Sequence, residues 1–189
     1  MRVILAAILF GLFSPGAGGE IRPDAALIEE AKAAAARWER EIDNGRYLSI
    51  IDYRKPSSVP RFFLLDLQAA TIRTYRVAHG RGSDRDHDGY AERFSNIPNS
   101  KMSSLGAYIT GETYQGRHGL SLRLKGLDAS NDKAEARAIV IHGADYVSPD
   151  RALPGRSWGC PALAQDVARE LIPDIAGGSF LYIVGNENQ

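Results

Sequence analysis

The run ARAIVIHG, from Ala136 to Gly143, decides the fold expected for this chain. Its apolar residues follow one another without alternating with polar ones, which is typical of a central strand buried on both faces of a sheet. His142 stands at the end of this run. Because a strand end holds side chains on a rigid scaffold, we interpret His142 as a candidate catalytic group.

Further strand candidates lie on both sides of this run. They are rich in β-branched and aromatic residues and are punctuated by glycine. We predict one strand in residues 47–53, two in 61–80, two in 105–127 and one in 179–185. Residues 80–101 are rich in Gly, Ser, Asp and Asn, and so long a loop in a compact domain is usually functional or mobile.

The segment before the first strand predicts one amphipathic helix. Asp24 can cap its start, and Asn44 with Gly45 ends it. Its apolar residues recur at helical spacing: Leu27, Ala31, Ala34, Ala35, Trp38 and Ile42. The expected fold class is therefore mainly β with an N-terminal helix.

Length and charge limit the possible functions. The chain has 189 residues, enough for one domain with a buried core. Its 23 basic and 23 acidic residues give zero net charge. A nucleic-acid partner is not expected without a basic face, and no polybasic segment indicates a membrane anchor. We expect a monomer.

The first residues, MRVILAAILFGLFSPGAGGE, have the pattern of a secretory signal peptide. The apolar run from Val3 to Phe13 is too short to span a bilayer. We predict cleavage between Gly16 and Gly19 and an exported protein of the periplasm or cell envelope, with no stable membrane anchor after cleavage. A buried N-terminal strand or helix is the alternative. The predicted parts are a signal peptide at 1–19, a helical segment at 20–48 and a catalytic domain at 49–189.

Cys160 is the only cysteine. An exported protein that used cysteine for structure would carry an even number, so an unpaired thiol suggests a chemical role. The following residues, ALAQDVARELIP, predict a helix that ends before Pro173, with Pro161 at its first position and Cys160 at the N-cap. There the helix dipole would stabilise a thiolate and lower the thiol pKa.

A histidine beside this thiol would make it a nucleophile. A neutral imidazole can take the thiol proton, as in acyl-transfer enzymes. Backbone N–H groups near Gly159 and Cys160 would then bind the developing oxyanion. The alternative is a core histidine, His142, and an unrelated buried cysteine.

The paired segments IHGADY and GRSWGCPAL resemble the His-Gly and Ser-x-Gly-Cys signature of the L,D-transpeptidase catalytic domain, also called the YkuD domain. RFFLLDLQAATIRTYRVAHGRGS is similar to the early hairpin of that family, and SSLGAYIT stands in place of its Thr-Pro-x-Gly-x-Phe segment. The murein L,D-transpeptidase branch is the most similar. The resemblance runs from about Ser49 to Val184 and implies a β-sandwich with a short helix after the cysteine.

The resemblance also implies an activity. Cys160 would attack peptidoglycan stem peptides and form a thioester, with His142 as general base and then acid, and a second stem peptide would accept the acyl group. No cofactor is implied, and carbapenems are expected to acylate the cysteine. Gly143, Ser157 and Gly159 are the candidates for oxyanion binding or for shaping the site.

Two positions depart from the commoner signature of the family. Trp158 replaces a histidine, and Ala162 replaces an arginine or asparagine that helps to hold the substrate or the site. Arg156 or Arg123 could instead supply the cation that meets a substrate carboxylate. Trp158 and His118 are further candidates for substrate contacts, and a structural histidine at a strand edge is the alternative for His118.

Two other functions remain open. If water accepts the acyl group, the protein is an L,D-carboxypeptidase or a related cysteine hydrolase. Asp84, Asp86 and Asp88 match the first half of a calcium loop, although Ser95 stands where glutamate is required. They are weak candidates for a Ca²⁺ site, which would suit a non-catalytic, calcium-dependent wall-binding module.

Overall fold

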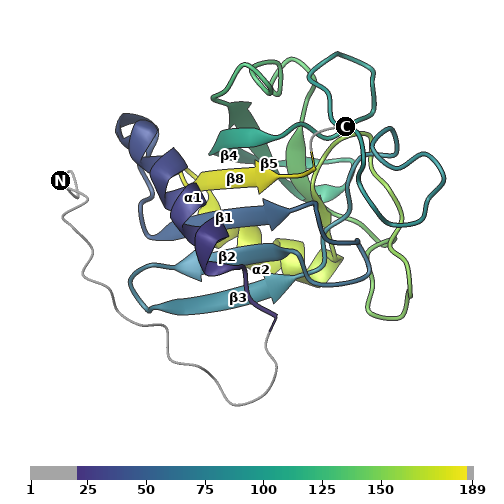
Figure 1. The fold of residues 1–189 in the computed structure, drawn as a ribbon, viewed down its shortest axis with the longest axis horizontal. Coiled ribbons are helices and arrows are strands. Elements are labelled where there is room, and N and C mark those ends of the chain that lie inside the picture. Colours follow the sequence, from purple (N-terminus) through teal and green to yellow (C-terminus); the bar gives the residue numbers. More distant parts are fainter. Residues whose placement is uncertain (1–20, 187–189) are drawn as a thin grey trace.

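The computed structural model describes residues 21–186, and the predicted signal peptide at 1–19 lies outside this range. The described residues form one eight-stranded sheet with two α-helices (Figure 1). This confirms the mainly β fold class, with a helix before the sheet and a short helix after Cys160. Neither helix has the length and apolar character of a membrane-spanning segment.

The strands follow the order β3-β2-β1-β8-β4-β5-β6-β7 across the sheet. β8 lies near the middle, parallel to β1 and antiparallel to β4. β6 forms from the run that we expected to be central, but it lies next to the edge strand β7. All of its residues are nevertheless buried, because β5 and β7 pair with its two sides. The bounds are β1 (Tyr47–Asp52), β2 (Phe62–Asp66), β3 (Thr71–Tyr75), β4 (Gly106–Gly116), β5 (Gly119–Gly126), β6 (Val140–Gly143), β7 (Ala162–Leu163) and β8 (Phe180–Val184).

The helix α1 (Ala25–Arg37) covers one face of the sheet. Its buried residues recur at helical spacing: Leu27, Ala31 and Ala34. Asp24 occupies the N-cap position, although its side chain makes no capping hydrogen bond. The helix ends at Arg37, before the predicted stop at Asn44. The N–H of Trp38 bonds the carbonyl of Ala35, a short 3₁₀ helix follows at Glu39–Glu41, and the N–H groups of Asp43 and Asn44 bind the carbonyl of Gly178.

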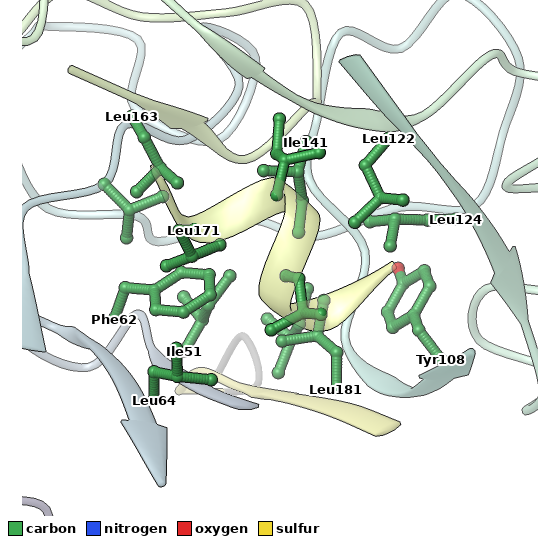
Figure 2. Close-up of a cluster of buried hydrophobic side chains, with 14 of the residues drawn as sticks. Ile51, Phe62, Leu64, Tyr108, Leu122, Leu124, Ile141, Leu163, Leu171 and Leu181 are labelled. Carbon is green, nitrogen blue, oxygen red and sulfur yellow. The ribbon is translucent and has the colours of Figure 1, made fainter. Parts of the chain in front are cut away.

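The helix α2 (Gln165–Ile175) packs on the opposite face, against β4, β5 and β6. Figure 2 shows its Leu171 in one cluster with Phe62, Leu122 and Leu181. Because successive strand residues point to opposite faces, the neighbouring Phe63 packs in the other cluster, toward α1. The sheet is thus buried between two helical layers, which explains its continuous apolar runs.

The predicted start of this helix, directly after Cys160, is wrong. Ala162 and Leu163 form β7 and pair with β6, and α2 begins at Gln165 with Ala164 at the N-cap. The helix also continues through Pro173, where we predicted its end. Tertiary pairing with β6 therefore overrides the helical periodicity that the sequence shows at Leu163.

Arg61 is the largest fully buried side chain among the described residues, with 0% exposure. Its guanidinium donates to the carbonyls of Val77 and Lys55, and Nη2 lies 2.6 Å from Nδ1 of His79. A guanidinium only donates, so Nδ1 accepts and Nε2 carries the proton, which it donates to Asp84 Oδ2 at 3.1 Å. Burial and the Arg61 charge lower the pKa of His79 and keep it neutral.

The segment that Arg61 holds runs beside Cys160. Ala78 exchanges two backbone hydrogen bonds with Ala162, and the carbonyl of His79 accepts the N–H of Ser157. Both sides of the cysteine are therefore attached to a chain segment that the buried arginine fixes.

We predict that Arg61→Met destabilises the protein strongly. Methionine has a similar length but no donors, so it leaves the carbonyl of Val77 and Nδ1 of His79 without their partner. Removal of one member of a buried charged network typically costs about 3–5 kcal/mol. Urea unfolding measures the loss. Arg46→Met, which removes an exposed arginine from its ion pair with Asp66, is the matched control, and an equal loss in both variants would contradict the prediction.

Candidate active site

The pairing of β6 with β7 brings the two predicted catalytic residues onto neighbouring chain segments. His142 is the parallel partner of Ala162, and its N–H lies 3.4 Å from the carbonyl of Pro161. Cys160 directly precedes Pro161. The His-Gly and Gly-Cys motifs thus meet along one side of β6.

The imidazole of His142 is held in one tautomer. The side chain is only 3% exposed, and Nδ1 lies 2.8 Å from the carbonyl oxygen of Gly143. Because a carbonyl only accepts, Nδ1 carries the proton and Nε2 is left with its lone pair. Burial lowers the pKa of His142, and the His118 charge lowers it further, against the opposing Gly143 hydrogen bond. The imidazole is therefore neutral at pH 7 and has a free basic nitrogen.

His118 lies directly on this imidazole. It occupies the turn between β4 and β5, and its ring stacks on that of His142 with centroids 4.3 Å apart and planes 24° apart. The structure thus brings His118 to the predicted catalytic histidine and fixes that ring from a second side.

The pKa of the Cys160 thiol shifts in the direction opposite to the prediction. Its Sγ lies 3.7 Å from the carbonyl oxygen of Ala138. Burial raises the pKa of the thiol, although the N–H of Val140 and the charge of Arg137 oppose this. The expected lowering was wrong, because the helix starts after Ala164 and its dipole does not act at Cys160.

Ser157 and Gly159 shape the turn that carries the cysteine. Ser157 Oγ donates to the carbonyl of Cys160 at 2.6 Å and accepts the N–H of Gly159 at 3.1 Å. Gly159 has φ +124°, a conformation that favours glycine. The N–H of Gly159 is thus occupied, whereas that of Cys160 has no acceptor among residues 21–186.

The two predicted substrate-binding arginines differ in their surroundings. Arg156 donates to the backbone carbonyl of Asp84, and its Nη1 lies 3.9 Å from the Asp84 carboxylate. Arg123 is exposed, with its guanidinium 4.7 Å from the ring centroid of Tyr114. It lies opposite Val140 of β6 and two residues from the partner of His142, hence on the same side of the sheet as that histidine. Of the two, only Arg156 lies near a carboxylate, and Arg123 stays a predicted substrate contact.

The predicted calcium residues do converge. Ligand oxygens of Asp84, Asp86 and Asp88 lie within 4.8 Å of one another. Asp84, however, already accepts hydrogen bonds from His79 and from the N–H groups of Asp88 and Gly89. Burial opposes its charge, but these hydrogen bonds keep its pKa below the ordinary value. Internal donors thus explain the position of Asp84, and the calcium site stays a prediction.

A family model described as L,D-transpeptidase catalytic domain matches residues 22–184. No curated protein sequence matches. Similar solved structures include the LD transpeptidase LdtMt1 in complex with imipenem, at 12% identity over 74% of this chain and 59% of that one, with a TM-score of 0.47. An L,D-transpeptidase from Mycobacterium smegmatis has 10% identity, the same coverages and a TM-score of 0.46.

A third similar structure is the helical cell shape determining protein Pgp2 from Campylobacter jejuni. It shares 13% identity over 78% of this chain and 49% of its own length, with a TM-score of 0.47. This chain thus spans between about half and three fifths of the length of these three structures.

We predict that Cys160 reacts with iodoacetamide as a thiol of raised pKa. The alkylation rate should rise through a pH above the value of about 8.5 that is usual for a free cysteine, because burial disfavours the thiolate. Intact-mass measurement between about pH 6 and pH 11 follows the reaction. The protein unfolded in urea is the control, in which the same thiol should titrate near 8.5. A folded-state rate that reached its plateau below about pH 8 would contradict the prediction.

Proposed function

Because the chain belongs to the L,D-transpeptidase catalytic domain family, we propose that it cross-links peptidoglycan by acyl transfer through a thioester on Cys160. The observation that supports the proposal is the pairing of β6 with β7, in which His142, with its free Nε2, is the partner of Ala162, two residues after Cys160. The proposed location is the cell envelope, in keeping with the family's usual association with the cell wall. No cofactor takes part in the proposed steps.

The first step starts from an uncharged pair. Burial raises the pKa of Cys160 and lowers that of His142, so both groups are neutral before substrate binds. Nε2 takes the proton of the thiol as Sγ attacks the carbonyl carbon between an L-centre and a D-residue. The free N–H of Cys160 is the donor available for the oxyanion. The C–N bond then breaks, and the leaving amine takes the proton from His142.

The second step consumes the thioester. An amine from a neighbouring stem peptide attacks the thioester carbonyl, and His142 accepts a proton from that amine. The C–S bond breaks, the new amide forms, and the sulfur takes the proton back. Water in place of the amine would give hydrolysis, so the accepting molecule alone separates a transpeptidase from an L,D-carboxypeptidase.

We predict that purified protein converts disaccharide-tetrapeptide into cross-linked dimers. Mass spectrometry of the products distinguishes the two reactions, since hydrolysis gives tripeptides instead. Cys160→Ala should form neither product, and Cys160→Ser should be nearly inactive because a hydroxyl is much harder to deprotonate than a thiol. The non-catalytic, calcium-dependent module would form neither product even in the wild type, while its biological activity would survive Cys160→Ser and be lost on chelation of metal ions.

We predict that His142→Ala slows acylation of Cys160 by a carbapenem by a factor on the order of 10² or more, as for loss of a general base. The adduct mass gives the rate without a natural substrate. His142→Ala added to Cys160→Ala should cause no further loss, because the two groups act as one unit. His87→Ala is the matched control, since His87 contacts the carbonyl of Pro154 on a loop. Unchanged adduct formation in His142→Ala would remove the histidine from the mechanism.

A further inference from the structure

An exposed tryptophan with two cations lies beside the cysteine. Trp158 stands two residues before Cys160 and is 69% exposed. Nζ of Lys101 lies 4.9 Å from the centroid of its ring, and the guanidinium carbon of Arg81 lies 5.9 Å from it. We name Arg81, Lys101 and Trp158 the cationic platform. Among residues 21–186, neither cation forms an ion pair with a carboxylate.

The backbone beneath the cationic platform is fixed. The N–H of Arg81 donates to the carbonyl of Ser157 at 2.8 Å, and the N–H of Gly82 donates to the carbonyl of Lys101 at 2.8 Å. The three chain segments touch so closely that a Cβ on Gly80 would collide with the carbonyl of Lys101. Lys101 itself has φ +57°, in the left-handed region that lysine rarely adopts.

This fixed backbone indicates that the cationic platform is not a random cluster of surface side chains. A lysine persists in a left-handed conformation only where its surroundings enforce it. Here the carbonyl of Lys101 accepts the N–H of Gly82, and the N–H of Arg81 donates to Ser157, so the backbone that carries both cations is fixed near one ring. Preorganised charges lose little entropy when they bind a ligand.

The chemistry of the cationic platform suits a carboxylate. Two cations that have no acidic partner can donate charge-assisted hydrogen bonds to one anionic group. Both cations also make cation–π contacts with the Trp158 ring. Arg156, which the sequence offered for this role, is already paired with Asp84. The position next to Cys160 means that the anion would belong to the molecule that reacts there.

We propose that the cationic platform binds a carboxylate group of the stem peptide that reacts at Cys160. The inference rests on the proposed function and adds the group that is recognised and the residues that recognise it. Two sources fit this chemistry: the terminal main-chain carboxylate of the peptide and a side-chain carboxylate within it.

The test measures binding without turnover. The dissociation constant of a stem tetrapeptide is determined by calorimetry for the Cys160→Ala protein, with and without Arg81→Met and Lys101→Met together. Loss of both cations should raise Kd by about tenfold or more, as expected when hydrogen bonds to a charged group are removed. The control is the Cys160→Ala protein with Arg40→Met and Arg169→Met, which remove the same charge at exposed positions elsewhere. Its Kd should equal that of the Cys160→Ala protein with an intact platform.

Two amidated peptides locate the carboxylate, one blocked at the terminal group and one at the side chain. The protein with an intact platform should bind one of them more weakly, and the Arg81→Met/Lys101→Met protein should no longer distinguish that peptide from the free acid. The proposal is overturned if neither amidation changes Kd, or if both proteins discriminate equally. If the double variant does not fold, the salt dependence of Kd decides: Kd should rise with ionic strength, and a salt-independent Kd also overturns the proposal.

The proposed function fails in a different way. A wild-type protein that forms no thioester with any stem peptide lacks the proposed activity, whatever its Kd values are. If the wild-type protein forms the thioester but shows no preference for a carboxylate, the proposed function stands and only the proposed role of the cationic platform is overturned.

Discussion

A buried guanidinium needs acceptors for its donors, and Arg61 finds them in the segment that runs beside Cys160. It binds the carbonyl of Val77 and the ring of His79, whose other nitrogen donates to Asp84. Because the desolvation of an unpaired charge is so costly, this chain of hydrogen bonds leaves the segment little freedom. The segment in turn pairs with the residues on both sides of Cys160, so a cation without a chemical role in the proposed reaction helps to fix where the thiol lies.

Opposite pKa shifts in Cys160 and His142 have one common cause. Burial disfavours the charged form of each group, so the thiol holds its proton and the imidazole stays unprotonated. A preformed thiolate would be reactive toward any electrophile. In the proposed mechanism the neutral pair becomes nucleophilic only when the proton moves during attack, which ties reactivity to a correctly placed substrate. The carbonyl of Gly143 makes this possible, because it fixes the tautomer that leaves Nε2 free.

Local patterns in the sequence predicted most helices and strands but fewer of the contacts between them. Apolar runs identified the strands, since both faces of the sheet are covered, and the spacing of Leu27, Ala31 and Ala34 identified α1. Helical periodicity failed after Cys160, because Leu163 belongs to a two-residue strand whose partner lies far away in the sequence. The motifs also selected His142 and Cys160, yet Arg61, Arg81 and Lys101 went unnoticed. Their roles depend on contacts between residues that are far apart in the sequence, and a local sequence pattern does not reveal such contacts.

The position of β8 at the middle of the sheet has a consequence for the order of assembly. Residues Phe180–Val184 are synthesised after all seven other strands, yet they alone join β1 to β4. Until β8 inserts, the hairpin units that emerge earlier have open edges and an incomplete apolar layer. Such long-range pairing slows folding and leaves edges available for association with other chains. The strands made earlier therefore stay open to association until the last strand is in place.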